Sequence, residues 1–449
     1  MNKINKTENI LKNNQNQNEV VNNKTSPNKL TDLVELKNNK FDDITERVKY
    51  IKVLLGENKL DPIIKYDTCD TEQVENRTNG YDIRNIMTKE YLDFHKMITN
   101  IGGKLLYIKS GTTGHTFKGI IYDEDGITEL SHYAVKVVAY PIRESYGNIN
   151  DIKRPENAEI MMLRVLSYFV VNKQTPHIVL PITTFNTSIK PFIAIAKNKI
   201  VENKKYDQFI KRHKQSEYHD EVSILISEWA NGGDLLDYIK NNYKTMKLRD
   251  WRVIFFQIIS VLCVIQNKYP GFRHNDLKAN NILVQKIDSR KKCNCFFYKI
   301  TIDGIQRNYI VPNIGIQIKL WDFDFACIPD VVENSKVNSE WTEKINVRPK
   351  QNRYYDLHYF FNTLTKKGFF PEFWDAKEIH HSVKQFVKDI VPEQYSKFEK
   401  EGKQNVTDRG RILIDDEFII PAKILTEHVF FHKMREPEQK TITQSNINT

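Results

Sequence analysis

The chain has 449 residues, 40% of them hydrophobic and 28% charged, which is enough for a two-lobed domain with extensions. Its formal charge of +10 would suit a polyanion, but the Lys and Arg residues are widely spread and no recognition motif accompanies them, so nucleic-acid binding is not expected. The five cysteines are scattered and do not form a disulfide framework. The sequence has neither a signal peptide nor an apolar run of about 20 residues, so we expect an intracellular, soluble protein without a membrane span.

The first and last segments are poor in apolar residues. Residues 1–30 are crowded with Asn and Lys, so we expect a disordered leader, and we expect the same of the tail at 434–449. Between Thr31 and Leu55 apolar residues recur at roughly helical intervals, which predicts one or two amphipathic helices in an extension that covers residues 31–100. The sequence does not show whether this extension inhibits the following domain or recruits partner proteins.

Short β-rich runs follow, separated by turn residues. They cover residues 105–108, 116–122 and 133–138, and they predict an antiparallel meander. A helix comes next, because Glu159, Met162, Leu163 and Leu166 have the spacing of one helical face. That face is expected to pack on the sheet.

The second half of the chain is mainly helical in pattern. After a basic insertion at 190–219, residues 222–228 predict another apolar strand, and Gly232-Gly233 ends it at a lobe boundary. Helices are then expected over 234–241 and 251–266. The role of this insertion and of a second one near 285–315 cannot be read from the residues.

The loop after these helices, residues 273–281, has the sequence Arg-His-Asn-Asp-Leu-Lys-Ala-Asn-Asn and places an acid, a lysine and an amide at the spacing that phosphoryl transfer to a hydroxyl requires. Asp276 would accept the proton of the attacking hydroxyl, and Lys278 would neutralise charge on the moving phosphoryl group. Asn281 would ligate a magnesium ion through its side-chain oxygen. A polar loop that only caps a helix would not explain a second acid, Asp322, which ends the buried run 318–322 and could hold magnesium against nucleotide phosphates.

A glycine-containing turn and a strand lysine complete the expected site. Gly111 and Gly114 lie in the turn 110–116, where backbone N–H groups could approach phosphate oxygens, although such turns are often plain hairpins. Strand alternation directs Ala134 and Lys136 to one face beneath this turn. Glu159 is the predicted partner of Lys136 if the helix docks on the sheet.

These segments together resemble the eukaryotic-type protein kinase superfamily over roughly residues 102–433. The sequence Asp322-Phe323-Asp324, the long insertion before it and the run 353–361 are similar to the serine/threonine kinase that poxviruses package in virions, with relatives across the nucleocytoplasmic large DNA viruses. The resemblance implies a bilobal α+β fold with an antiparallel sheet in an N-lobe (101–230) and a mainly helical C-lobe (231–433). It also implies ATP and Mg²⁺ as cofactors, Ser or Thr residues of proteins as substrates, possible virion partners, and a location in the virion and host cytoplasm.

Further roles follow only from this resemblance. Glu228 to Ala230 look like the hinge that binds adenine, Ser227 like the gatekeeper, and Asp234 like a ribose contact. Ala134 and Leu283 would sandwich the base. Asp356 resembles the buried helix acid that braces the catalytic loop, and the run 421–431 is similar to the last C-lobe helix.

The chain departs from the family pattern at several positions. Lys109 replaces the first loop glycine, Asn275 replaces the arginine that usually receives an activation-loop phosphate, and Asp324 replaces the glycine of Asp-Phe-Gly. No Ala-Pro-Glu follows, and the nearest run is Arg348-Pro349-Lys350. Three alternatives to an active kinase therefore stay open: a pseudokinase scaffold, a small-molecule kinase, and a structural virion protein without nucleotide affinity.

Overall fold

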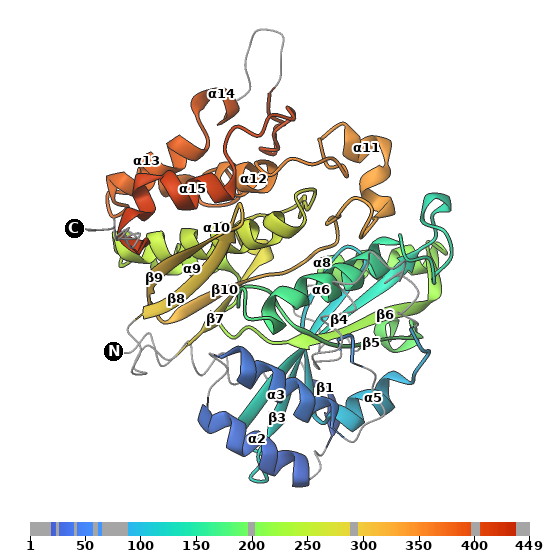
Figure 1. Ribbon diagram of the computed structural model, residues 1–449. Coiled ribbons are helices and arrows are strands. Elements are labelled where there is room, and N and C mark those ends of the chain that lie inside the picture. Colours follow the sequence, from blue (N-terminus) through green and yellow to red (C-terminus); the bar gives the residue numbers. More distant parts are fainter. Residues whose placement is uncertain are drawn as a thin grey trace, which may run out of the picture.

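The protein, seen in a computed structural model, consists of two lobes, with the N-terminal sheet and helices at one end and the C-terminal helices at the other (Figure 1). The residues described are 19–23, 27–39, 43–56, 62–64, 89–195, 203–287, 295–396 and 405–436. Strands dominate the first lobe and helices the second, so the predicted bilobal α+β fold is confirmed. Over these ranges no helix combines the length and the apolar character needed to cross a lipid bilayer.

The N-lobe is built on one antiparallel sheet with the strand order β1-β2-β3-β4-β6-β5. The register pairs Tyr107 with Phe117 and Thr116 with Lys136, so the predicted meander exists; Ala134 pairs with Ser227, and the sheet continues beyond the meander. The strands are β1 (Glu19–Asn23), β2 (Gly103–Ser110), β3 (Gly114–Tyr122), β4 (Glu129–Pro141), β5 (Pro181–Ser188) and β6 (Tyr218–Glu228).

Helix α6 (Pro155–Val171) packs on this sheet and carries Glu159. Pro155 occupies its first turn, where a missing N–H costs no helical hydrogen bond. The preceding Arg154 is fully buried and donates to the carbonyl oxygens of Gly147 and Pro141, both at 2.7 Å. These contacts fix the start of the helix and therefore the position of Glu159 one turn later.

The expectation of disorder for the whole leader is wrong for part of it. Residues 19–23 form β1, which pairs antiparallel with the edge strand β2, and α2 (Pro27–Asn39) begins before residue 30. An edge strand offers unpaired N–H and C=O groups, and β1 satisfies them. The remainder of the leader, residues 1–18 and 24–26, and the tail from residue 437 lie outside the described residues.

The predicted amphipathic helices of the extension are α2 and α3 (Ile44–Leu55), and α5 (Phe94–Ile101) follows them. A buried lysine joins all three. Lys29 of α2 donates from Nζ to the carbonyl oxygens of Leu54 at 2.8 Å and Ile101 at 2.9 Å, at the ends of α3 and α5. Terminal carbonyls lack partners within their own helices, so one ammonium group satisfies two helix ends.

Helix α3 also reaches the junction of the lobes through Arg47. Its guanidinium contacts the Glu228 carboxylate at 2.9 Å and donates to the carbonyl oxygens of Pro176 at 2.8 Å and Ile178 at 2.6 Å. Lys319 approaches the same carboxylate from the C-lobe at 3.2 Å. Burial alone would raise the pKa of Glu228, but the two cations outweigh it and hold the pKa below its usual range.

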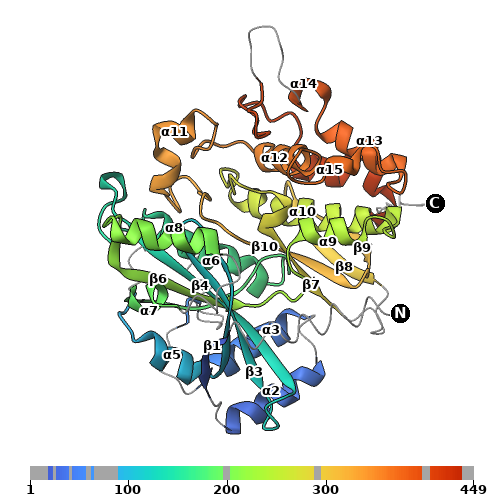
Figure 2. The same ribbon diagram turned by 180° about the vertical axis from the view of Figure 1, so that it is seen from behind.

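The first insertion folds onto the N-lobe sheet. It contains α7 (Lys190–Ile193) and α8 (Asn203–Lys214), and α8 lies close to β6 (Figure 2). The ring of Phe209 on α8 packs 4.4 Å from that of His115 and 5.1 Å from that of Tyr218. The insertion is therefore part of the N-lobe core.

The C-lobe is centred on the long, largely buried helix α10 (Leu248–Lys268). The second insertion forms a hairpin, β8 (Cys295–Ile302) and β9 (Ile305–Pro312), against which Phe256 of α10 packs at ring distances of 5.2 Å to both Tyr298 and Tyr309. The remaining elements are β7 (Ile282–Lys286), β10 (Ile316–Leu320), α9 (Leu235–Asn242), α11 (Glu340–Glu343), α12 (Tyr355–Leu364), α13 (His381–Ile390), α14 (Glu393–Ser396) and α15 (Pro421–Glu427).

The contact between Arg47 and Glu228 predicts a measurable stability effect. At pH 7, Arg47→Met should lower the free energy of unfolding by about 3 kcal/mol, because it leaves a buried carboxylate short of a partner. Since the folded-state pKa of Glu228 is depressed, this contribution is present above the ordinary value of 4.5 and is lost as the pH falls below it. Urea denaturation of both proteins at neutral and acidic pH measures the difference.

Lys49→Met on the same helix is the matched control, because Lys49 belongs to an exposed ion pair with Glu46. Its effect should stay within about 0.5 kcal/mol. Equal effects of the two substitutions would contradict the role given to Arg47.

Candidate active site

Lys136 is the centre of the candidate site. Its Nζ atom lies 2.6 Å from Oε1 of Glu159 and 3.0 Å from Oδ1 of Asp322. The three side chains come from β4, from α6 and from the turn after β10, so one ammonium group connects the sheet, the helix and the C-lobe. The predicted contact between Lys136 and Glu159 is present, and Asp322 joins it.

The pKa values in this cluster follow from burial and charge. Burial lowers the pKa of Lys136, but the charges of Asp322 and Glu159 outweigh it and raise the pKa above its ordinary value. The pKa of Asp322 falls to about 2, because Lys136 overcomes the opposing effect of burial. Burial dominates at Glu159 and raises the pKa of that carboxyl. Lys136 therefore carries its charge at neutral pH.

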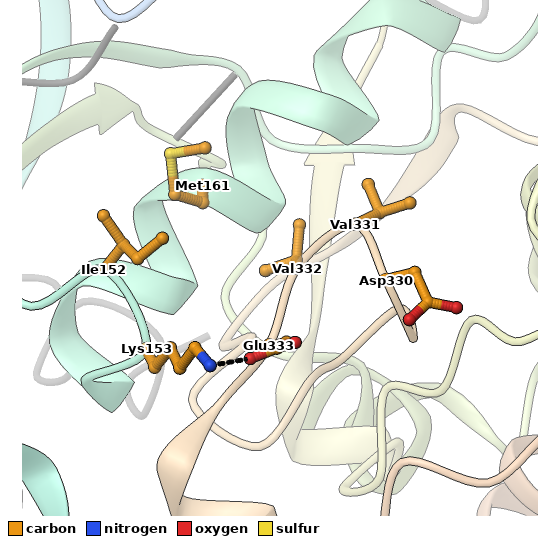
Figure 3. A pocket seen from close by; sticks show the side chains of 7 residues that line it. All are labelled: Ile152, Lys153, Met161, Asp330, Val331, Val332 and Glu333. Atoms are coloured by element: carbon orange, nitrogen blue, oxygen red, sulfur yellow. Dashed lines mark ion pairs between the residues drawn. The ribbon is translucent and has the colours of Figure 1, made fainter. Parts of the chain in front are cut away.

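The segment that follows Asp322 packs against the start of α6. Lys153 pairs with Glu333 at 2.5 Å and accepts the N–H of Ser335 on its carbonyl oxygen at 2.7 Å. Residues 330–333, the segment before α6 and α6 itself enclose a small pocket (Figure 3). It is lined by Ile152, Lys153, Met161, Asp330, Val331, Val332 and Glu333. These contacts keep the helix that carries Glu159 close to the loop that carries Asp322.

The predicted residues of the 273–281 loop also converge. Oδ2 of Asp276 accepts a hydrogen bond from Nδ2 of Asn281 at 2.9 Å and lies 2.8 Å from Nζ of Lys278. Asn281 ends a short 3-10 turn, Ala279–Asn281, which turns its amide back toward Asp276. The amide nitrogen is directed at Asp276, so the side-chain oxygen of Asn281 is the atom that could ligate a cation.

Asp356 of α12 holds the backbone of this loop. Its two carboxylate oxygens accept the N–H groups of His274 at 2.7 Å and Asn275 at 2.9 Å. His274 in turn contacts the carbonyl oxygen of Trp321 through Nε2 at 3.0 Å. The loop that carries Asp276 is thus tied directly to the residue before Asp322.

The glycine turn is positioned over the same end of the sheet. Gly111 donates its N–H to the carbonyl oxygen of Gly114 at 2.8 Å. A Cβ atom at Gly114 would lie 1.8 Å from the carbonyl oxygen of Val137, whereas one at Gly111 would meet only the Gly114 oxygen at 3.8 Å. Packing therefore requires glycine at 114 but not at 111. The carbonyl oxygen of Thr112 accepts from Arg212 and from Tyr218, both at 3.2 Å, so the first insertion anchors the turn.

The residues assigned to the nucleoside lie at the junction of the lobes. Ala134 is paired with the buried Ser227, and Asp234 forms a bridge with Leu283. The carboxylate of Asp234 accepts the N–H of Asp237 at 2.9 Å and so caps α9. The side chain of Glu228 points to Arg47 and Lys319, and its N–H donates to Leu180 at 3.1 Å.

Three contacts in the site were not predicted from the sequence. Arg411 pairs with Asp276 at 2.5 Å, Lys336 pairs with Asp324, and the ring of Trp321 lies 5.6 Å from Nζ of Lys136. Lys336 lies in a single 3-10 turn, Ser335–Asn338, and Arg411 lies outside the helices and strands, so neither belongs to a periodic pattern that the sequence could reveal. Trp321 belongs to the run 318–322 that predicted a strand. Its contact with Lys136 was not predicted, because this cation–π contact depends on the docking of the two lobes.

A two-lobed α+β fold with a strand lysine paired to a helix glutamate, and with acids on two loops that His274 connects, is the arrangement found in protein kinases. Residues 130–412 match the family described as poxvirus serine/threonine protein kinase, and the chain belongs to this family. The chain is therefore a serine/threonine protein kinase of the kind found in poxviruses and other nucleocytoplasmic large DNA viruses.

Individual relatives agree with this assignment. A protein of Acanthamoeba polyphaga mimivirus whose name describes a serine/threonine-protein kinase is 45% identical over 405 residues, which are 89% of this chain and 82% of the relative. Serine/threonine-protein kinase 2 of swinepox virus is 31% identical over 150 residues, 33% of this chain and 30% of the relative. The protein of the same name in vaccinia virus is 29% identical over 168 residues, 37% and 32% of the two chains.

The bracing of the loop by Asp356 gives a prediction. Asp356→Asn should lower the free energy of unfolding by about 1–3 kcal/mol, because an amide group replaces one of the two acceptors and leaves a buried N–H unpaired. Thermal unfolding followed by circular dichroism measures the loss. Asp375→Asn, at an exposed position of the same lobe, should leave the midpoint unchanged. An unchanged midpoint for both variants would contradict the bracing.

Proposed function

We propose that the enzyme transfers the γ-phosphoryl group of ATP to Ser and Thr hydroxyls of proteins, with a requirement for Mg²⁺ and with Asp276 as the catalytic base. The observation that carries the proposal is the position of Lys136, held between Glu159 and Asp322 with its charge retained. A partly buried cation that keeps its charge suits a polyanionic ligand, and in kinases this lysine pairs with the α- and β-phosphates.

The nucleotide end of the site would use both lobes. Gly111 is free of packing constraints on its side, so the backbone of the turn suits close approach by phosphate oxygens. Ala134 and Leu283 would enclose the base, Glu228 to Ala230 would provide the hinge, and Asp234 would reach the ribose. Since Glu228 directs its N–H to Leu180, the hinge contacts would come from Ala230 and from the carbonyl oxygen of Glu228.

The donor set at the metal position fits Mg²⁺. Asp322 contributes a carboxylate whose pKa is about 2, and Asn281 contributes an amide oxygen, both of them hard oxygen ligands of the kind that this cation prefers. When bound, the cation would neutralise charge on the phosphate oxygens. Lys136 would then exchange its contact with Asp322 for one with the phosphates, while Glu159 keeps it in place.

The hydroxyl end of the site would use the 273–281 loop. Asp276 would orient the hydroxyl of the substrate and accept its proton, and Lys278, 2.8 Å away, would face the transferred group. A lysine two positions after the acid favours a serine/threonine protein kinase over a small-molecule kinase. A scaffold without turnover is disfavoured, because all five groups are retained, with Lys136 in contact with Glu159 and Asp322 and with Asp276 in contact with Asn281.

Transfer of labelled phosphate from ATP to a basic protein substrate tests the proposal. Lys136→Met and Asp276→Asn should each reduce turnover by about 10² or more, because each removes a charge that acts on the transition state. Lys299→Met, at an exposed position of β8, is the control and should behave as the wild type. Turnover of Lys136→Met within about threefold of the wild type, with its fold intact, would contradict the assigned role.

We further propose that the enzyme is packaged in the virus particle and acts on virion proteins in the host cytoplasm. Membership of the poxvirus kinase family supports this location. Gradient-purified particles treated with protease should retain the kinase in immunoblots, protected by the particle. Its loss from protease-treated particles, with an internal particle protein retained, would contradict packaging.

A further inference from the structure

Arg411 contacts the acid of the catalytic loop directly. Its guanidinium lies 2.5 Å from Oδ1 of Asp276, donates to the carbonyl oxygen of Asn275, and donates to the hydroxyl of Tyr355 at 3.0 Å. The side chain is nearly buried, with 9% of its surface exposed. This arginine follows Asp276 by 135 residues, outside every motif that predicted the site.

The surroundings of Arg411 form a built site for its guanidinium. The plane stacks on the ring of Tyr359, with 4.1 Å between the central carbon and the ring centroid. Its own backbone is fixed in a tight turn, in which Arg411 and Thr407 exchange hydrogen bonds and Gly410 adopts a φ of +87°. Asn362 of α12 donates to the carbonyl oxygen of Gly410 at 2.9 Å. The ring of Tyr359 therefore holds the guanidinium, while the turn and Asn362 hold the backbone that carries it.

The two oxygens of Asp276 are anchored by different groups. Oδ1 contacts Arg411, whereas Oδ2 contacts Asn281 and Lys278. The terminal torsion of an aspartate is broad and roughly two-fold, so contacts at one oxygen alone leave the carboxylate able to rotate. A guanidinium at the opposite oxygen fixes the rotation as well as the position.

We propose that Arg411 is a positioning residue that sets the orientation of the Asp276 carboxylate toward the substrate hydroxyl. This inference rests on the proposed function of Asp276 as the catalytic base. Asn275 stands where related kinases have an arginine, and Arg411 brings a cation to the same loop from a distant segment, with one contact to the Asn275 carbonyl and one to the acid itself.

The turn that carries Arg411 is connected to the segment before α12. The carbonyl oxygen of Ile412 accepts from Asn346 at 3.0 Å, and Asp415 pairs with Arg348 at 2.5 Å. Arg273, at the start of the catalytic loop, donates to the carbonyl oxygen of Lys350 at 3.2 Å. Residues 346–350, which include the run nearest in sequence to the missing Ala-Pro-Glu, therefore contact both the turn of Arg411 and the start of the catalytic loop.

Steady-state kinetics of Arg411→Gln and Arg411→Ala test the proposal against Arg409→Gln, an exposed arginine on the same turn. We expect kcat of both Arg411 variants to fall about 10- to 100-fold with little change in the KM for ATP, because a misoriented reacting group costs turnover rather than nucleotide binding. Arg409→Gln should keep the wild-type kcat. Added guanidinium ion at millimolar concentration should restore part of the kcat of Arg411→Ala, which loss of fold would not allow.

Asp276→Asn, assayed in parallel, separates this inference from the proposed function. If Asp276→Asn is inactive while Arg411→Gln keeps a kcat within about threefold of the wild type, or exceeds it, the positioning role is wrong and the proposed function stands. If Asp276→Asn retains turnover, the proposed function itself fails. A folded Arg411→Ala that guanidinium ion does not restore would also overturn the positioning role.

Discussion

The ammonium group of Lys136 forms an ion pair with one carboxylate from each lobe, and the arrangement of the site depends on these two ion pairs. Glu159 and Asp322 both contact the same charge, at 2.6 and 3.0 Å. Removing charges from water is costly unless they are paired, so the lobes are favoured in the arrangement that pairs them. The same requirement makes the surroundings of Lys136 suitable for phosphates, because an incoming anion can replace one carboxylate without leaving the lysine unpaired.

Two residues in the loops of the site adopt the left-handed backbone conformation, which Asn and Asp tolerate better than other side chains do. Asn275 and Asp322 have φ values of 62° and 63°, in the left-handed region that carries an energetic cost for residues with a side chain. Asp356 compensates by accepting the N–H of Asn275, and His274 joins the two loops through the carbonyl oxygen of Trp321. The acid groups of the site are therefore placed by contacts of the surrounding backbone.

The sequence predicted those features that depend on local periodicity. Alternation along β4 and helical spacing along α6 predicted that Lys136 and Glu159 meet if the helix docks on the sheet, and the sequence of the 273–281 loop predicted the Asp276 cluster. The pairing of β1 with an edge strand and the contacts of Arg47 and Arg411 were not predictable in this way. Arg47 and Glu228 are 181 residues apart, and such contacts depend on how whole elements dock, which no short pattern encodes.

At two positions where the chain departs from the family pattern, the replacing residues make other contacts. Asp324 pairs with Lys336, and Asn275 donates through its amide to the carbonyl oxygen of Phe325 at 3.0 Å, so both residues stabilise the segment after Asp322 without a phosphate. We propose that Lys136 holds the nucleotide between the lobes. A crystal structure with Mg²⁺ and a non-hydrolysable ATP analogue tests this proposal, and we expect phosphate oxygens at Lys136 and the cation at Asn281 and Asp322. A nucleotide bound elsewhere, with Lys136 still paired to Asp322, would contradict it.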